Sequence, residues 1–313
     1  MIGFLGRRLI QLIITMLGIV TVAFFLMRAI PGDPAAYILG DYATKEALAT
    51  LRSQLGLDRP VLEQYLIFMG RALTGDLGSS VVTGQPALSE ITSSLPSSAA
   101  LAVLGLLIAI AIGIPLGIMS AVYQGTWIDV TIMLGALAGI SFPVFWFGLV
   151  AILVFAHWLS IFPALGSTNS DSIWVNIYYL LLPALVFGFS IAAYIARLTR
   201  SAMLEVLSQD YIRVARAMGI SEGKIVFRYA LRNALIPILA VIGVTFAWAF
   251  GNAILIEVVF SRPGVGSTLL KAILARDYQL VQAGVLVLAA IVVVINVTLD
   301  VSYGFIDPRL RNT

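Results

Sequence analysis

Few side chains in this sequence of 313 residues have the chemistry of a catalytic group. It contains no Cys and a single His, His157. Nucleophilic catalysis needs a nucleophile beside a base, and metal-assisted catalysis needs several ligands around one ion. One His cannot supply an HExxH zinc site, and no DxxD pattern occurs. Because His157 stands beside Trp158 at the edge of an apolar stretch, we interpret it as a boundary residue. The sequence predicts a chain that is not an enzyme and binds no metal or cofactor itself.

Three carboxylates, Asp129, Glu257 and Asp300, stand close to long apolar stretches. A carrier driven by an ion gradient places Asp, Glu, His or Lys near the middle of the bilayer to bind the driving ion. All three stand instead near the ends of the stretches, where charges usually snorkel or pair. We therefore interpret them as structural. The neutral interior indicates that the energy for any transport comes from elsewhere.

The segment 197–234 holds seven of the 19 Lys and Arg residues. Its pattern predicts two helices, Met203–Met218 and Glu222–Leu231, on either side of a short turn. The first would carry an apolar stripe of Leu204, Leu207, Tyr211 and Val214, with Arg213 and Arg216 off it. The second has Lys224, Arg228 and Arg232 at intervals of four, with Ile225 and Phe227 among its apolar positions. A solvated connector needs no apolar stripe, so we expect a docking surface for another protein.

The turn of this segment contains Gly219 and Ser221. Gly after the last helical residue can adopt a left-handed conformation that stops the helix. Ser before the first helical residue can cap the next one. The two residues together predict a short, rigid elbow.

The composition indicates which kind of element positions this elbow. The chain is 60% apolar and 11% charged, with a mean hydropathy of +1.00. A soluble domain has about 25% charged residues, so most of this surface must face lipid. Six apolar stretches are long enough to cross a hydrocarbon core of about 30 Å. They are roughly 9–30, 97–122, 130–156, 174–196, 235–258 and 281–303.

The flanks of these stretches predict the orientation. The first stretch exceeds the ~7–15 apolar residues of a cleavable signal, and no A-x-A site follows it, so we interpret it as an uncleaved signal anchor. With both termini inside, the inner segments hold eleven Lys and Arg and the short outer segments hold three. This excess predicts an N-in, C-in topology.

The long outer segment 31–96 is predicted to form a small helical cap. Thr44–Leu55, ended by Gly56, and a stretch from Asp58–Pro60 to Leu73 have helical start and stop signals. The residues 75–80 follow as a turn-rich loop. The last outer segment is expected to open with a turn at Pro263–Gly266 and to continue into a short amphipathic helix, Ser267–Leu274.

Two stretches around the elbow carry a family motif. Residues 210–219 (D-Y-I-R-V-A-R-A-M-G) and 231–237 (L-R-N-A-L-I-P) resemble the coupling loop of permeases of binding-protein-dependent ABC importers, E-A-A-x3-G-x9-I-x-L-P. Gly219 and Leu231 are kept, whereas Arg213-Val214-Ala215 replaces E-A-A, Tyr229 replaces Ile and Arg232 replaces Pro. These departures resemble the dipeptide/oligopeptide/nickel branch, and within it the first, B-type membrane subunit.

Further matches to this branch follow in order along nearly the whole chain. They are Pro31–Pro34, Leu55–Pro60, Gly75–Gly78, Pro263–Gly266, Arg276–Tyr278 with Gln282, and Asp307–Arg311. Six motifs in register are much more specific than one. The resemblance implies an all-α, type I ABC importer permease fold of six transmembrane helices, a single permease domain over 1–313, in a bacterial or archaeal plasma membrane.

The resemblance also implies partners and site residues. A second permease subunit, two ATP-binding subunits or one fused, and an extracytoplasmic substrate-binding protein are expected, with ATP and Mg on the ATPases and no nucleic acid. The coupling loop 197–234 is expected to meet an ATPase through Arg213, Ala215, Arg216, Ala217, Gly219, Ile220, Ser221 and Glu222. Candidates for an external gate or a binding-protein contact are Asp33, Pro263, Gly264, Gly266 and Asp277.

The cargo implied by this branch is di- and oligopeptides. Nickel chelates, glutathione and other small solutes are alternatives that use the same motifs. From another class, a stand-alone ion-coupled secondary transporter or a membrane scaffold without a path is also considered, but both leave the docking elbow unexplained. The second, third and fifth spans contain Gly and Pro and are candidates to line the path.

Overall fold

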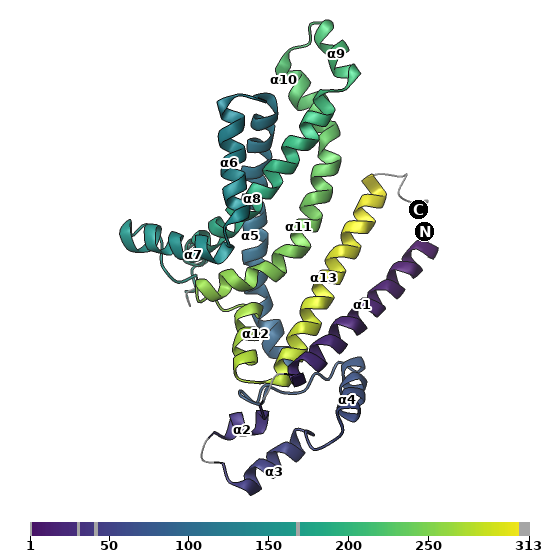
Figure 1. Ribbon diagram of the computed structural model, residues 1–313, viewed down its shortest axis with the longest axis vertical. Coiled ribbons are helices and arrows are strands. Elements are labelled where there is room, and N and C mark those ends of the chain that lie inside the picture. Colours follow the sequence, from purple (N-terminus) through teal and green to yellow (C-terminus); the bar gives the residue numbers. More distant parts are fainter. Residues whose placement is uncertain (1, 30–31, 41–42, 167–169, 307–313) are drawn as a thin grey trace. The chain divides into compact units, whose positions relative to one another are not determined.

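The computed structural model describes residues 2–29, 32–40, 43–166 and 170–306. Within these ranges the regular structure is helical, apart from one isolated bridge between Ser79 and Pro86 (Figure 1). The predicted all-helical class is therefore confirmed for the described residues. The chain divides into two compact units. Unit 1 comprises Met1–Ser97 and Pro263–Val294, and unit 2 comprises Ser98–Arg262 and Ile295–Thr313.

Five described helices are long and apolar enough to cross a membrane. They are Leu12–Ala29 within α1 (Ile2–Ala29), α5 (Ala87–Val122), α8 (Ile173–Leu207), the run Glu222–Val259, and Tyr278–Leu299 within α13 (Tyr278–Ile306). The run Glu222–Val259 joins α10 (Glu222–Lys224), the π-helix η2 (Ile225–Ala230) and α11 (Leu231–Val259). A bent pair of helices makes a sixth span if it is counted as one.

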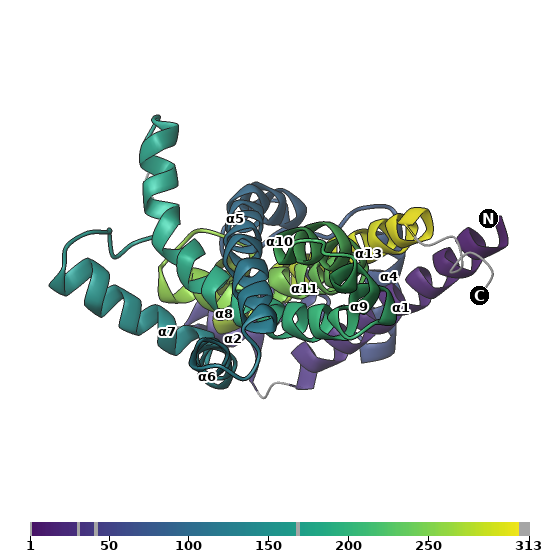
Figure 2. The same ribbon diagram turned by 90° about the horizontal axis from the view of Figure 1, so that it is seen from above.

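This bent pair occupies the region where the sequence suggests one apolar stretch, 130–156. α6 (Trp127–Ser141) is followed by α7 (Val144–Ala151) and the π-helix η1 (Ile152–Trp158), and the two parts differ in direction by 102°. Figure 2 shows α7 leading away from α6. The break has a local cause, because Pro143 has no N–H to donate and restricts the residue before it to extended conformations. Phe142 accordingly has φ −86° and ψ 139°.

Within unit 2, glycines let α5 and α8 approach each other closely. A Cβ placed on Gly113 would lie 2.8 Å from the carbonyl oxygen of Ala192, and one on Gly117 would lie 2.6 Å from that of Ala196. From the other side, a Cβ on Gly188 would lie 2.7 Å from the carbonyl oxygen of Gly105. Gly113 and Gly117 have the G-x-x-x-G spacing that brings membrane helices into backbone contact. Each glycine leaves room for the backbone and side chains of the opposite helix, so α8 packs closely against α5.

Unit 1 contains the described helices of the segments that are predicted to lie outside, α2 (Pro34–Leu39), α3 (Lys45–Gln54), α4 (Val61–Leu73) and α12 (Val265–Leu274). α3 has the predicted start and stop, because Thr44 Oγ1 accepts from the Ala47 N–H at 3.2 Å and Gly56 follows with φ +66°. The core of unit 1 is formed by apolar side chains from α1, α5, α12 and α13, together with Leu77. Its largest members are Met27, Ile91, Leu269 and Leu280.

Candidate functional site

The elbow in unit 2 consists of α9 (Asp210–Ala217), the turn after it, α10 and η2. α9 ends as predicted at Gly219, which has φ +79°. The Gly219 N–H donates to the Arg216 carbonyl at 2.9 Å, and the Ile220 N–H donates to the Ala215 carbonyl at 3.2 Å. This pair of bonds is the Schellman arrangement, in which a left-handed residue lets the chain reverse while satisfying the last carbonyls of the helix. The direction of the turn therefore depends on Gly219.

A small apolar cluster holds the elbow together. Ile212 and Ala215 of α9 and Ile225 of η2 are buried, and Leu207 and Ile220 pack against them. Ala215, one of the expected coupling residues, therefore supports the elbow from inside and offers no contact surface. Small buried clusters of this kind keep two helices in one arrangement, because burial of apolar area is favourable and close packing transmits displacement. The elbow can move as one body.

The predicted apolar stripe of the first helix does not lie on a single face. α8 ends at Leu207, and Ser208 and Gln209 interrupt the helix before α9 begins. Leu204 and Leu207 pack inward against unit 2, whereas Tyr211 and Val214 are exposed. The spacing of the apolar residues alone could not reveal this change of face, because reading a stripe from spacing assumes one continuous helix from 203 to 218. The interruption turns the later half of the stripe outward.

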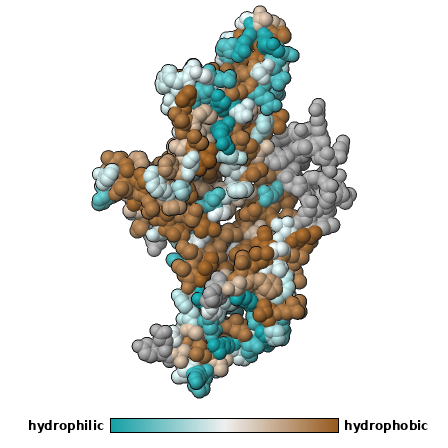
Figure 3. Space-filling view, viewed as in Figure 1, coloured by the Kyte–Doolittle hydropathy of each residue, from teal (hydrophilic) through white to brown (hydrophobic). Residues whose placement is uncertain are grey.

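The outer surface of the elbow combines apolar and charged side chains. Five large apolar residues are exposed: Tyr211, Val214, Met218 at 68%, Phe227 and Tyr229. Arg216 Nε lies 2.8 Å from Glu222 Oε1, so this ion pair bridges the Gly219 turn, and Arg213 pairs with Asp210 within α9. In Figure 3 hydrophilic residues gather at the end of unit 2 that carries α9 and α10. An exposed apolar patch surrounded by polar groups is typical of a protein-binding surface.

Ser221 stands at the N-cap position of α10, but its side chain makes no capping hydrogen bond. The residues Gly219–Gly223 have the spacing of a G-x-S-x-G nucleophile motif. In that motif the Ser sits on a turn from a strand into a helix, whereas Ser221 lies between two helices. His157, the only His, belongs to η1 at another place in unit 2. The Ser221 motif is therefore a feature of the helical turn and not of a catalytic site.

Asp129 connects three helices next to the elbow. Its carboxylate receives Nε and Nη2 of Arg200, each at 2.7 Å, and the Ser120 hydroxyl also donates to it. The Gly125 N–H completes the set at 3.0 Å. Asp129 is on α6, Arg200 is on α8 and Ser120 is on α5. The sequence indicated a structural role for Asp129, but nothing in it identified Arg200 as the partner.

Glu257 is the second carboxylate expected to be structural. It is 1% exposed and accepts a hydrogen bond from the Ser98 hydroxyl at 2.5 Å. Arg262 lies nearby and donates to the Gly166 carbonyl. Burial lowers the pKa of the Arg262 guanidinium, and the Glu257 carboxylate opposes that shift. The side chain of Asp300 lies outside the described part.

The five expected outer-face residues all belong to unit 1, and four of them have local structural partners or are buried. Asp33 accepts from the Ala35 N–H at 3.1 Å as the N-cap of α2, and Arg52 Nε lies 2.7 Å from its other oxygen. Asp277 is fully buried, caps α13 through the Leu280 N–H at 3.1 Å and accepts from the Ser80 hydroxyl at 2.5 Å.

The remaining three lie around the start of α12. Gly264 donates its N–H to Ser267 Oγ at 2.9 Å, and both Gly264 and Gly266 are buried. Only Pro263 is exposed among the five expected residues. It is therefore the one best placed to contact a partner directly.

These features define a class of protein: a helical, multi-span membrane protein with a rigid elbow between two of its spans. The chain belongs to the family of binding-protein-dependent transport system inner membrane components, whose pattern it matches over residues 113–312. Residues 1–102 match the N-terminal region of such membrane components. The chain is thus a non-catalytic membrane component of a transport system that also includes a binding protein and an ATPase.

The curated relatives agree over the full length. The dipeptide transport system permease protein DppB of Alkalihalophilus pseudofirmus is 40% identical, over 99% of this chain and 100% of the relative. The di/tripeptide transport system permease protein DppB of Pseudomonas aeruginosa is 38% identical, over 100% and 99%. The dipeptide transport system permease protein DppB of Escherichia coli is 37% identical, over 100% and 99%.

Proposed function

We propose that this chain is one of two unlike permease subunits of an ATP-driven peptide importer, and that its elbow carries the motion of an ATPase into the spans. The second permease subunit would form the other half of the path. ATP and Mg would be bound by two ATPase subunits, or by one fused chain, and the extracytoplasmic binding protein would deliver the cargo. The coupling loop would be 197–234 and the outer cap 31–96.

The geometry of the elbow is the observation that carries this proposal. The Schellman turn at Gly219 and the Ile212–Ala215–Ile225 cluster support movement as one body. Of the eight expected coupling residues, Arg213, Arg216, Ala217, Gly219, Ser221 and Glu222 are exposed, Ile220 is half-buried and Ala215 is buried. Val214 and Met218 add exposed apolar area beside them. We propose that these two, with Arg213 and Arg216, enter the ATPase groove.

The cargo follows from the relatives. Those described above are named for dipeptides or for di- and tripeptides, at 37–40% identity over almost the whole chain. Peptides are therefore the proposed cargo. On the outer side, Pro263 is the proposed contact for the binding protein, because it is exposed at the start of the segment leading into α12.

Reconstitution of the complete complex in proteoliposomes tests the proposal. Uptake of a labelled dipeptide is expected to require ATP and the binding protein, and unlabelled dipeptide is expected to compete. Met218→Asp is expected to lower uptake at least about tenfold, because a charge buried in an apolar groove costs several kcal/mol, whereas Met218→Leu keeps uptake.

Two results would contradict the proposal. Uptake driven by an ion gradient with this chain alone would make it a secondary carrier. Competition by a nickel chelate or glutathione but not by dipeptide would keep the coupling mechanism and replace the cargo.

A further inference from the structure

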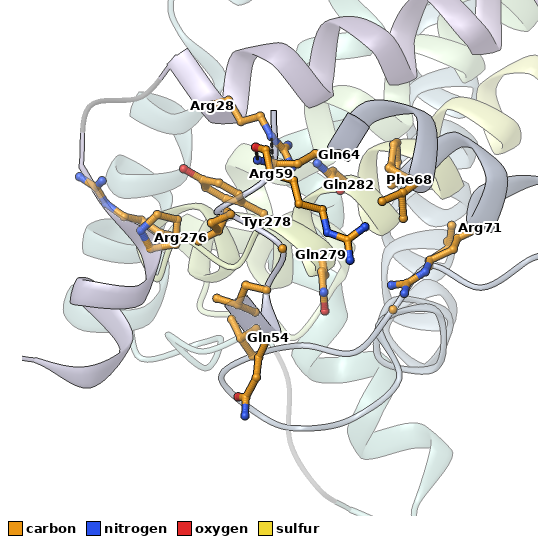
Figure 4. A pocket seen from close by; sticks show the side chains of 18 of the residues that line it. Arg28, Gln54, Arg59, Gln64, Phe68, Arg71, Arg276, Tyr278, Gln279 and Gln282 are labelled. Atoms are coloured by element: carbon orange, nitrogen blue, oxygen red, sulfur yellow. Dashed lines mark hydrogen bonds between the residues drawn. The ribbon is translucent and has the colours of Figure 1, made fainter. Parts of the chain in front are cut away.

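Unit 1 contains a partly open cavity of about 230 Å³, and none of the expected coupling or gate residues lines it. Its walls come from the end of α1, the α3–α4 connection, α4, the loop after α4 and the beginning of α13 (Figure 4). The charged side chains in the wall are Arg28, Arg59, Arg71 and Arg276 against a single carboxylate, Asp76. The cavity is therefore strongly cationic.

The arginines of the cavity have few anionic partners. Arg59 pairs with Glu63 at 3.0 Å, and both are about half exposed. Arg28 donates Nε and Nη2 to the neutral Gln64 Oε1, at 3.0 and 2.8 Å. Arg28, Arg71 and Arg276 form no ion pair among the residues that the structure describes. Asp76 accepts from the Gly78 N–H. Excess positive charge thus remains for a ligand.

Two residues that line the cavity each carry a buried donor without an acceptor among the described residues. They are Gln282, which is 6% exposed, through Nε2, and Arg276 through Nη1, which lies against Gly32. In Figure 4 Gln282 lies near Gln64 and Arg28, while Arg71 reaches in from the other side. Buried polar groups are nearly always hydrogen-bonded. An unfilled donor beside excess positive charge favours a ligand that is anionic and accepts hydrogen bonds.

The position of the cavity indicates which anion this is. Arg28 is in the last turn of the candidate span Leu12–Ala29, and Tyr278 and Gln282 are in the first two turns of Tyr278–Leu299. The cavity therefore lies where apolar segments of unit 1 end, at the depth of lipid head groups. Basic pockets between the ends of transmembrane helices are one known form of lipid head-group site, described for the cytoplasmic side, and the guanidinium fork matches phosphate geometry on either side. Phe68 and Ile67 add apolar wall.

We propose that this cavity binds the phosphate of an anionic phospholipid head group. Arg28, Arg71 and Gln282 surround the phosphate oxygens, and Arg276 contributes from the edge. A bound lipid fixes the outer cap to the ends of α1 and α13 within unit 1. The assignment of the cavity to the outer leaflet rests on the proposed N-in topology, but the site itself does not.

Native mass spectrometry of the complete transport complex tests the site. Detergent-purified complex is mixed with short-chain phosphatidylglycerol or phosphatidylcholine, and bound lipid is titrated for the wild type and for Arg71→Gln. Arg71 is exposed, so its loss leaves the fold intact. We expect phosphatidylglycerol to bind and Arg71→Gln to weaken it about tenfold, the value of one charge-assisted hydrogen bond. Gln282→Leu, which removes the buried donor, is expected to weaken it as well.

The matched control is Lys45→Gln, which removes one positive charge from the exposed surface of α3 outside the cavity. It is expected to bind phosphatidylglycerol like the wild type. Equal weakening by Lys45→Gln and Arg71→Gln would overturn the proposal, because attraction would then be unspecific.

Competition distinguishes the sources of the anion. Displacement of phosphatidylglycerol by inorganic phosphate only at high concentration supports a lipid site. The lipid proposal would be overturned if inorganic phosphate bound tightly and phosphatidylglycerol were not preferred over phosphatidylcholine. The ligand would then be free phosphate. The lipid proposal would also be overturned if neither lipid were preferred and Arg71→Gln weakened the docking of the substrate-binding protein. The ligand would then be a carboxylate of that protein. Because transport is not measured, failure here leaves the proposed function unaffected.

Discussion

Arg200 of α8 holds Asp129 of α6 through two parallel hydrogen bonds of 2.7 Å, across 71 positions of sequence. The Asp129 side chain is 7% exposed and that of Arg200 26% exposed. Arg200 lies two turns before the end of α8, and α9 begins after Ser208 and Gln209. The pair therefore fixes the part of α8 that carries the elbow to its neighbours in unit 2, so that movement of the elbow moves helices and not only a loop.

Asp129→Asn is expected to lower the free energy of unfolding by roughly 1–3 kcal/mol, because it leaves a partly buried guanidinium without its charge partner. Thermal unfolding in detergent measures the effect. The control is Asp210→Asn, which breaks the exposed pair with Arg213. Exposed ion pairs contribute about 0–1 kcal/mol, so an equal loss in both variants would contradict the role of the Asp129–Arg200 pair.

Gly117→Ala is expected to separate α5 from α8. The new Cβ would lie 2.5 Å from Thr199 Cβ and 2.6 Å from the Ala196 carbonyl oxygen, and overpacking of this kind costs about 1–3 kcal/mol. Gly135→Ala in α6 is the matched control because its Cβ meets no atom within 4 Å. It should be neutral or slightly stabilising, as Ala is the better helix former. A thermal shift of the same size in both variants would refute close α5–α8 packing.

Gly219→Ala is expected to strain the elbow by about 1–2 kcal/mol, since a left-handed conformation is unfavourable for a residue with a Cβ. The chain should still insert, but peptide uptake per ATP hydrolysed should fall. Gly223→Ala is the control, as its φ is not positive and its Cβ meets open space. Simultaneous measurement of uptake and ATP hydrolysis checks this. Unchanged coupling in Gly219→Ala would show that the shape of the turn is unimportant.

The topology can be tested directly because the chain has no Cys. Single substitutions Lys45→Cys and Leu165→Cys are expected to react with a membrane-impermeant thiol reagent from outside intact cells, and Glu222→Cys only after permeabilisation. All three positions are exposed. Labelling of Glu222→Cys in intact cells would reverse the proposed N-in orientation.

Local signals predicted those parts of the structure that depend on few neighbouring residues. Gly219 and Gly56 end helices because a positive φ favours Gly, and Thr44 begins one because its hydroxyl can accept an N–H. The 102° bend beside Pro143 was less accessible, because bundled membrane helices often tolerate Pro.

Contacts between distant segments were not predictable in the same way. Arg200 was one of seven basic residues in its segment, and no spacing rule connects it with Asp129. The same holds for the cationic cavity, where Arg28 from α1 and Gln282 from α13 meet Arg71 from α4. Burial also changed roles that the motifs suggested. Ala215 and Asp277, which were expected to contact partners, are buried supports of the elbow and of α13.

The central claim is that the elbow contacts the ATPase, and cysteine cross-linking from Met218 tests it most directly. In a complete complex whose other subunits carry one engineered Cys in the ATPase groove, Met218→Cys is expected to form a permease–ATPase cross-link whose yield changes with ATP. Tyr123→Cys, an exposed position in the loop between α5 and α6, is the control and should form none. Cross-linking from Tyr123→Cys but not from Met218→Cys would contradict the claim.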